Sequence, residues 1–284
     1  MSLNSVNSNF GATVALQSLN ATKSALEATQ KQISTGFRVN DASDDGAAFA
    51  VAQRVRSDVG ALTSANQQLG NVQGLLSTTN AALTDVSNAL INARNVLVKL
   101  SDGTVQGTQR SQYIQQYNSL VSNVKSFLTD AVYNSKTLIG NINGATGFGR
   151  VAVSRNEVGA TYGIGTFSGS AFVASLTFTS TQLGGAGTVA ALIGTAAAAT
   201  FINKINSLGT ALNTYGAATN YVTAQVSYNN NKIDALNNGI GSLVDADLTK
   251  ESALLQSLQI KQQLGTQALS IANQAPQSLL SLFK

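Results

Sequence analysis

The most regular pattern in the sequence is a heptad repeat of apolar positions between residues 46 and 100. Two series of apolar residues, each with a period of seven, run through this stretch, and the second follows the first by three residues. This alternation of three and four residues is the a and d pattern of a coiled coil. It predicts one helix of about 55 residues, about 80 Å long at 1.5 Å per residue. The first series is Val55, Leu62, Leu69, Leu76, Leu83, Leu90 and Leu97, and the second is Ala65, Val72, Thr79, Val86, Ala93 and Leu100.

Heptads resume in the last third of the chain. Between the two heptad regions, glycines in residues 101–109 predict a turn, and apolar residues from Ile114 to Leu128 predict a second helix that folds back on the first. The late heptads predict a long helix that returns along the early ones. Its first series is Ile205, Leu212, Val226, Ile233 and Ile240, and its second is Leu208, Tyr215, Val222, Leu236 and Leu243.

The middle of the chain, from about residue 133 to residue 200, has a different pattern. Glycine, threonine and serine are frequent there, and apolar residues alternate with polar ones in places. In "AFVASLTFTS", Phe172, Leu176 and Phe178 fall on one face of an expected strand. We therefore expect a small β region between the two helical halves.

Both ends of the chain carry apolar repeats but almost no charge. No charged residue occurs from Ser2 to Thr22 or from Gln262 to Phe283. Because the helical halves flank the middle region, the two ends become neighbours, and pairing them buries one face of each. The outer faces then consist of Ser, Asn, Gln and Thr without charge, which is unusual for a solvated helix and suits burial against copies of the same chain.

The expected fold is mainly α: a long antiparallel coiled-coil or helical hairpin rod formed by the N- and C-terminal parts, with a small β-rich central insert. Five segments follow, namely an inner helix at 1–40, rod helices at 41–140, a variable β region at 141–200, a rod helix at 201–242 and a second inner helix at 243–284. The expected rod core comprises Leu62, Leu69, Leu76, Leu83, Leu90, Leu97, Ile205, Leu212, Val226 and Ile233.

Composition narrows the possible functions. Charged residues make up only 11% of the 284 residues, and His, Cys and Trp are absent. Thiol and imidazole chemistry and Cys or His metal sites are therefore excluded, and we expect no catalytic residues, no cofactor and no metal. The net charge of +4 is scattered without a basic run, so we expect no nucleic-acid partner. No apolar stretch is long enough for a membrane span, and the first residues lack the pattern of a cleaved Sec signal.

Two interpretations of the uncharged ends remain open on pattern alone. In one, an ordinary four-helix bundle buries both ends internally. In the other, the chain is a subunit of a polymer, and neighbouring subunits cover the exposed faces of the terminal helices.

Two longer motifs bear on this choice. The segment "ISTGFRVNDASDDGAAFAVAQRVRSDV" at 33–59 resembles the N-terminal signature of bacterial flagellins, and "LGTQALSIANQAPQSLLSLFK" at 264–284 resembles their C-terminal signature. The likeness covers about residues 1–140 and 200–284. It implies an extracellular filament subunit for swimming motility, in which terminal helices line a channel, heptad helices surround them and the middle faces outward.

The resemblance also implies partners and assembly residues. The expected partners are other copies of the chain, the flagellar type III export apparatus, an export chaperone, the filament cap and hook-junction proteins. The linker residues Arg38, Asn40, Asp44 and Asp45 are expected to contact neighbouring subunits. The expected assembly residues of the inner helices are Leu19, Leu26, Ile33, Leu255, Leu264, Leu269, Asn273, Gln274, Pro276, Gln277, Leu280 and Leu282.

Asp44 and Asp45 also invite a metal-site interpretation. A helix start explains them better, with Asp41 or Ser43 as the N-cap and both acids in the first helical turn. Pro276 is expected to interrupt the last helix.

The segment "LINARNVLVKL" aligns with the flagellin surface that a vertebrate innate immune receptor recognises. Arg94 matches that pattern, but Asn92, Val96 and Tyr117 depart from it, so we expect weak receptor activation. A hook-filament junction protein with flagellin-like ends is the nearest alternative function. An amphipathic membrane-inserting protein and an enzyme are weaker alternatives.

Overall fold

The computed structural model describes residues 9–140, 142, 150–194 and 200–281, with the backbone alone for residues 275–281. The chain forms two compact units, one from residues 1–58 and 234–284 and the other from residues 59–233. Two long helices, α2 (Gly46–Leu100) and α7 (Phe201–Val244), contribute to both units. The 55 residues of α2 form one uninterrupted helix, which confirms the helix predicted from the heptads.

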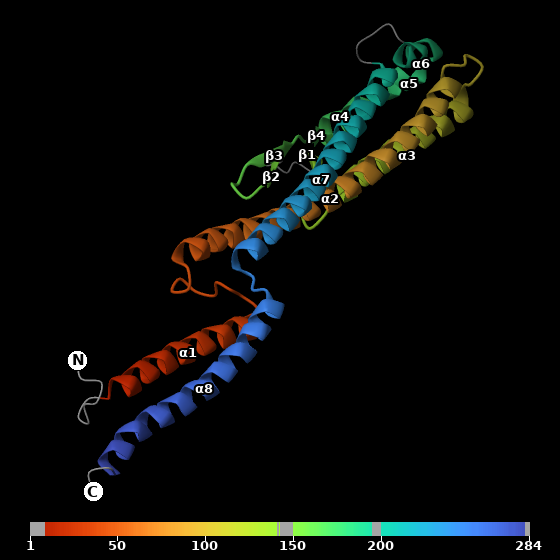
Figure 1. Cartoon of the computed structure of the whole chain (residues 1–284). Coiled ribbons are helices and arrows are strands. Elements are labelled where there is room, and N and C mark those ends of the chain that lie inside the picture. Colours follow the sequence, from red (N-terminus) through yellow and green to blue (C-terminus); the bar gives the residue numbers. More distant parts are fainter. Residues whose placement is uncertain (1–8, 141, 143–149, 195–199, 282–284) are drawn as a thin grey trace. The chain divides into compact units, whose positions relative to one another are not determined.

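In the second unit α2 and α7 pack antiparallel, as the heptad repeats predict (Figure 1). The six leucines of the first α2 series from Leu62 to Leu97 are all at most 1% exposed. Beside this apolar seam, amide and hydroxyl groups join the two helices: Asn66 binds Asn230, Gln73 binds Thr223, and Asn80 binds Thr219. Neutral hydrogen bonds rather than ion pairs therefore flank the seam, in keeping with the low charge of the chain.

On α7 the more deeply buried residues belong to the second heptad series. Leu208, Tyr215 and Val222 are at most 2% exposed, whereas Ile205 and Leu212 of the first series are only half-buried, as are Val226 and Ile233. Helix α7 is thus rotated so that the second series faces α2.

Helix α3 (Gly107–Asp130) follows a short turn after α2. The turn is organised by Arg110, which is only 8% exposed and donates to three carbonyl oxygens: Leu100 at the end of α2, Val105 in the turn and Leu183. The partial negative charge at the C-terminus of α2 favours a cation there, and the three carbonyls supply the partners that a buried guanidinium requires.

In the residues that the structure describes, the central insert contains four short strands. Strand β1 (Ile139–Gly140) pairs in parallel with β4 (Phe167–Ser168), and β2 (Val151–Ser154) pairs antiparallel with β3 (Thr161–Ile164), with Val151 opposite Ile164. The described part of the insert, which leaves out residues 141, 143–149 and 195–199, also contains the short helices α4 (Gly169–Leu176), α5 (Ser180–Gly184) and α6 (Ala186–Ile193). A small β component is therefore confirmed, but the insert as a whole is mixed α and β.

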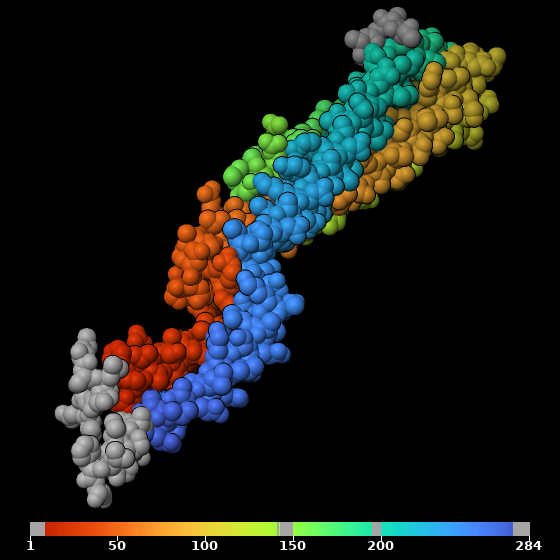
Figure 2. Space-filling view, viewed as in Figure 1, coloured from red at the N-terminus to blue at the C-terminus, as the bar shows by residue number. Residues whose placement is uncertain are grey.

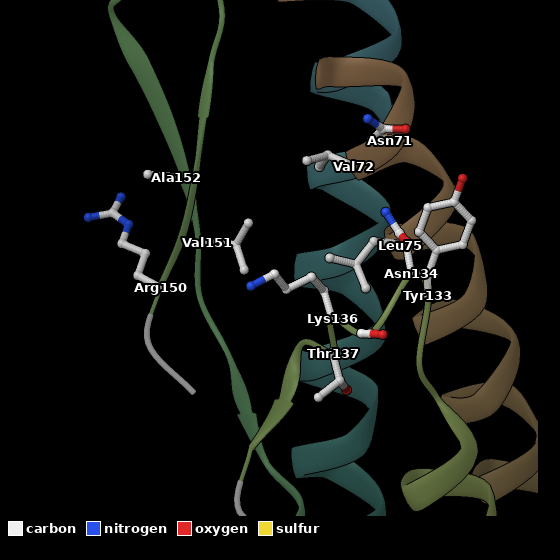
Figure 3. Close-up of a pocket in the computed structure, with 11 residues that line it drawn as sticks. Asn71, Val72, Leu75, Tyr133, Asn134, Lys136, Thr137, Arg150, Val151 and Ala152 are labelled. Atoms are coloured by element: carbon white, nitrogen blue, oxygen red, sulfur yellow. The ribbon is translucent and has the colours of Figure 1, made fainter. Parts of the chain in front are cut away.

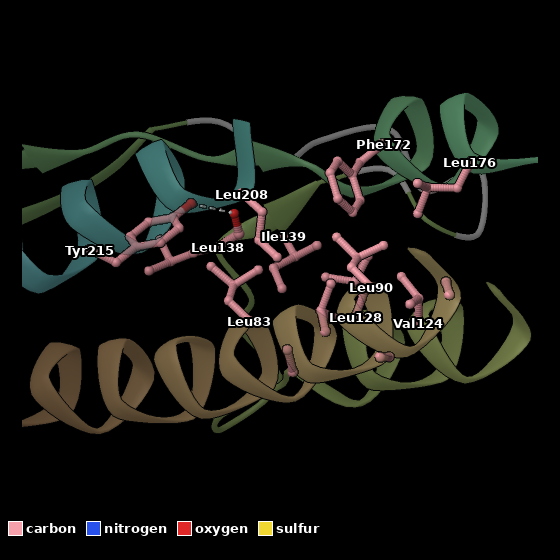
Figure 4. Packing of buried hydrophobic residues seen from close by; sticks show 14 of the residues in the cluster. Leu83, Leu90, Val124, Leu128, Leu138, Ile139, Phe172, Leu176, Leu208 and Tyr215 are labelled. Carbon is pink, nitrogen blue, oxygen red and sulfur yellow. Dashed lines mark hydrogen bonds between the residues drawn. The ribbon is translucent and has the colours of Figure 1, made fainter. Parts of the chain in front are cut away.

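The strand predicted in "AFVASLTFTS" is wrong, because most of this stretch is α4. Phe172 and Leu176 lie four residues apart, a spacing that places them on one face of a strand and also on one face of a helix. Packing decides between the two: both side chains enter the core with Leu90 and Val124 (Figure 4). The hydroxyl of Tyr117 donates to the carbonyl oxygen of Leu176 at the end of α4, where helical carbonyls lack intrahelical partners.

In the first unit, α1 (Phe10–Thr35) packs against α8 (Leu248–Ser281), and the pair lies side by side in Figure 2. The pairing is antiparallel, since Asn9 at the start of α1 donates to the carbonyl oxygen of Ala272 and Phe37 pairs with Asp245 at the other end. The interruption expected at Pro276 is wrong, because α8 continues to Ser281.

Candidate assembly surfaces

The contact between α1 and α8 is a narrow seam of small and apolar residues. On α1 the side chains least exposed to solvent recur at spacings of three and four residues, and the most buried are Leu26 and Thr29. On α8 the same spacing runs through Leu258, which is 6% exposed, and Gly265. A Cβ at Gly265 would lie 3.2 Å from the Leu19 side chain, so the glycine permits close approach of the helices.

The linker between α1 and α2 is held in place by hydrogen bonds to the segment between α7 and α8. The backbone N–H groups of Arg38 and Val39 donate to the carbonyl oxygen of Val244 at 2.7 and 3.2 Å, and that of Ala246 donates to Gly36 at 3.0 Å. The Arg38 guanidinium donates to the carbonyl oxygen of Leu243, in the last turn of α7. A cation at this position is favourable because helix C-termini carry partial negative charge.

A small ion cluster fixes the same linker to α1. The Lys31 ammonium lies 2.6 Å from Asp41 and 3.0 Å from Asp44, and Asp44 also accepts from the backbone N–H groups of Asn40 and Asp41. The hydrogen bond from Lys31 holds the pKa of each carboxyl below its usual range, and those bonds raise the pKa of Lys31. The cluster therefore stays charged at neutral pH and orients the chain between the two helices.

The expected N-cap, Asp41 or Ser43, is wrong by four or two residues. Helix α2 begins at Gly46, and Asp45 is its cap, because the Asp45 carboxylate accepts from the backbone N–H groups of Ala47 and Ala48 at 3.0 Å. The first turn of α2 contains no acidic residue. Asp41 and Asp44 are taken up by Lys31 and by loop amides, so they are not available to cap α2. Asp44 and Asp45 therefore have separate structural roles, one as a partner of Lys31 and the other as the cap of α2, and they do not form a paired-carboxylate site.

A second apolar face on α8 lies open to solvent. Ile260, Leu264 and Ile271 are 58, 58 and 68% exposed, and their spacing places them on one side of the helix, away from the seam. On α1, Phe10 and Val14 are 67 and 49% exposed, also away from the seam. A helix with apolar residues on opposite sides is typical of one that is enclosed by neighbours.

The expected assembly residues fall into three groups. Leu26 is buried, and Leu19, Ile33, Leu255 and Leu269 are half-buried at the seam. Leu264, Asn273 and Gln274 are exposed. The side chains of Pro276, Gln277 and Leu280 and the whole of Leu282 lie outside the described residues. The structure thus divides the set into residues that join α1 to α8 and residues that remain open on α8.

Comparison with known proteins identifies the family. Residues 6–144 match the bacterial flagellin N-terminal helical region, and residues 195–283 match the bacterial flagellin C-terminal helical region. The chain belongs to the bacterial flagellin family. Flagellins are structural subunits of the extracellular flagellar filament, so this chain is a filament subunit and not an enzyme, and the recognition of both end motifs is confirmed.

Full-length relatives agree with this assignment. The flagellin is 34% identical to flagellin FljK and 35% identical to flagellin FljM of Caulobacter vibrioides, with 100% of each chain covered. It is 33% identical to a flagellin of Brucella melitensis over 99% of both chains. The crystal structure of Bacillus cereus flagellin aligns with 66% of this chain and 94% of that chain at 16% identity and a TM-score of 0.41, from which nothing further is concluded.

Among the helices in the described ranges, none combines the length and the apolar character needed to cross a membrane.

Asn229 is a core residue of the second unit that the apolar heptad pattern does not predict. Asn229 is fully buried and occupies the position that continues the series Leu208, Tyr215, Val222. Its amide donates to Asn66 on α2 at 2.8 Å and to the carbonyl oxygen of Arg155 in the insert at 3.0 Å. A polar residue at a core heptad position fixes register at some cost in stability. The gap in the heptad series at 229 was the available signal.

Proposed function

We propose that the open apolar faces of α1 and α8 are the surfaces through which flagellin subunits join in the filament. The observation that supports this is the exposure of Ile260, Leu264 and Ile271 along one side of α8. Apolar residues scattered singly on a surface are normal, whereas a contiguous exposed row marks an interaction site. Burying them against another subunit provides a favourable contribution to polymerisation through removal of apolar area from water.

The low charge of the terminal helices supports the same surface. From Gln262 to Phe283 the chain carries no charge, and from Ser2 to Thr22 it carries none either. Packing uncharged helices together avoids the desolvation cost that buried charges impose. In this proposal residues 1–40 and 243–284 form the inner part of the filament, residues 41–140 and 201–242 the surrounding part, and residues 141–200 the outward face.

The test compares polymerisation of the full chain with that of the variant I260N/L264N/I271N. The variant removes only exposed apolar surface, so its monomer keeps the helical content of the wild type, while the protein concentration needed for filament growth rises about tenfold or more. Seeded growth followed by light scattering and electron microscopy measures this concentration.

The matched control is V158N, which changes the most exposed large apolar side chain, at 78%, in the other unit. Growth of V158N filaments should match the wild type. If the triple variant also grows like the wild type, the α8 face is not a subunit contact and the proposal fails.

The remaining partners belong to the same proposal. We infer that the chain is exported unfolded by the flagellar type III apparatus with an export chaperone, and that it contacts the cap and hook-junction proteins, because the family resemblance implies these steps. Linker residues Arg38, Asn40, Asp44 and Asp45 are proposed as subunit contacts in addition to their internal hydrogen bonds. Loss of secretion in a strain without a working flagellar export gate would support the route, and unchanged secretion would contradict it.

Weak activation of the vertebrate receptor also stays a proposal. Arg94 and Asn92 are exposed on α2, as a recognised surface requires, whereas Val96 and Tyr117 are buried and are unsuited to receptor contact. The departure from the recognised pattern therefore rests on Asn92. Strong signalling by the purified monomer in reporter cells would contradict the proposal.

A further inference from the structure

A pocket in the second unit lies between α2 and the central insert. Its volume is about 590 Å³, within the range of small-molecule sites. One wall is Val72 and Leu75 of α2, another is the turn at residues 133–137, and the third is the start of β2 at Val151 (Figure 3). Among the lining residues that the structure describes, Lys136 and Arg150 are cationic and none is a carboxylate.

The turn that carries Lys136 has two residues in the left-handed region of backbone conformation. Tyr133 and Lys136 exchange two backbone hydrogen bonds of 2.9 Å, and the two residues between them, Asn134 and Ser135, have φ values of 48° and 61°. Asparagine tolerates the left-handed region, but serine adopts it less readily than glycine. Strained backbone of this kind is concentrated at binding sites, where it holds side chains in place. Here it directs Lys136 across the pocket toward Val151 (Figure 3).

Two glycines allow side chains of the pocket to lie directly against the backbone. A Cβ at Gly74 of α2 would be 2.6 Å from the Tyr133 ring, so the ring packs flat on the helix at this point. A Cβ at Gly163 of β3 would be 2.0 Å from the Arg150 guanidinium, which also donates to the Gly163 carbonyl oxygen at 3.4 Å. Tyr133 is thereby fixed as an aromatic wall, whereas the Arg150 guanidinium is held against β3 at the rim and points away from Lys136 (Figure 3).

From this arrangement we propose that the pocket binds an anionic sugar unit bearing a carboxylate or a sulfate. Lys136 binds the anionic group, and no acidic side chain among the described lining residues opposes it. The exposed amides of Asn71 and Asn134 suit the hydroxyl groups of a sugar, and the Tyr133 ring and Leu75 offer an apolar surface for its C–H face. The volume accommodates about two sugar rings.

The experiment titrates the full-length monomer with a chondroitin disaccharide, in sulfated and unsulfated forms, by calorimetry. Saturable binding is expected with a Kd on the order of 1 mM, weakening as salt is raised. K136Q is expected to weaken binding about tenfold, since it removes a charge-assisted hydrogen bond. R150Q is expected to have a smaller effect, because Arg150 lies at the rim.

Two variants distinguish binding in the pocket from attraction to the overall positive charge of the protein. K125Q removes an exposed cation from α3, outside the pocket, and should bind like the wild type. G74A should weaken binding by displacing Tyr133, and circular dichroism of the variant checks that it remains folded. Comparison of the two disaccharide forms tells whether Lys136 binds the sulfate or the carboxylate.

Several results would overturn the proposal. Absence of saturable binding at about ten times the expected Kd would do so. Equal weakening by K125Q and K136Q would show attraction to overall charge instead of a site. Equal binding of lactose, which is neutral, or full competition by inorganic sulfate at the same concentration would show that an anionic sugar is not what the pocket selects.

Discussion

At the residue scale, two buried tyrosines of this flagellin hold the central insert through neutral hydrogen bonds. Tyr117 and Tyr215 are buried in the second unit, and their hydroxyls donate to backbone carbonyls of the central insert. The Tyr215 hydroxyl donates to the carbonyl oxygen of Leu138 at 3.1 Å (Figure 4) and to that of Gly165 at 3.2 Å. These bonds attach the insert to α3 and α7, and they require that both phenols remain protonated.

This requirement predicts an alkaline transition. Burial raises the pKa of Tyr215 to about 12, and it raises the pKa of Tyr117 further. Unfolded tyrosine ionises near pH 10, so the folded state holds its protons more tightly. The contribution of the two protonated phenols to the free energy of unfolding is therefore fully present below about pH 10, and it is lost as pH rises toward 12. Circular dichroism and the ultraviolet absorbance of tyrosinate should change together in this range.

Two variants test the assignment. Tyr215→Phe removes one of the buried ionising groups and should make stability less dependent on pH above 10, although it loses hydrogen bonds worth about 1 kcal/mol at neutral pH. Tyr228→Phe changes a tyrosine that is 60% exposed and should leave the transition in place. A wild-type protein whose helices are equally stable at pH 9 and pH 12 would contradict the argument.

At the element scale, the heptad seam of α2 carries the stability of the second unit. Leu83 is fully buried among Leu90, Leu138 and Ile139 (Figure 4), whereas Ile91 on the same helix is 52% exposed. Truncation to alanine should therefore lower the free energy of unfolding more at Leu83 than at Ile91, although both residues lie on the same helix.

Leu83→Ala should lower the free energy of unfolding of the second unit by about 3 kcal/mol, because it leaves a cavity in packed surroundings. Ile91→Ala should change it by no more than about 0.5 kcal/mol, as is usual at exposed positions. Urea unfolding of the monomers, followed by circular dichroism, measures both. Equal effects of the two variants would show that α2 does not pack through this heptad series.

At the scale of the whole molecule, the two units differ in how completely they bury their helices. The second unit has a continuous core that joins its long helices to the insert. The buried core cluster of the first unit consists of Val39, Ala52 and Val244, and α1 and α8 pack through only one face each. Helices buried on one face exchange their amide hydrogens more readily than helices in a core.

Hydrogen exchange should therefore be faster in α1 and α8 of the monomer than in α2 between Leu69 and Leu100. In the filament, exchange in α1 and α8 should slow by about tenfold or more, since neighbouring subunits cover the open faces. Mass spectrometry of peptides from monomer and filament gives both rates. Protection of α1 and α8 that is already complete in the monomer would mean that the terminal helices do not depend on neighbours.

The sequence by itself determined the long helices and their pairing, because a sustained heptad repeat has one interpretation over many turns. It also determined the family, through two extended motifs at the ends. Local patterns were less decisive. The spacing of Phe172 and Leu176 suits a strand or a helix, and only contacts with the core selected α4. The sequence favoured Asp41 or Ser43 as the cap of α2, but Asp41 and Asp44 bind Lys31, and Asp45 caps the helix.

Tertiary structure alone decided which apolar residues stay open and where the pocket forms. Leu264 and Leu269 are alike in sequence, but only Leu269 lies at the seam with α1. Likewise, Gly74 and Tyr133 are far apart along the chain, and their contact is required for the aromatic wall of the pocket. Helical periodicity specifies which side a residue occupies, but burial depends on which other segment covers that side, and that is a property of the folded chain and its neighbours.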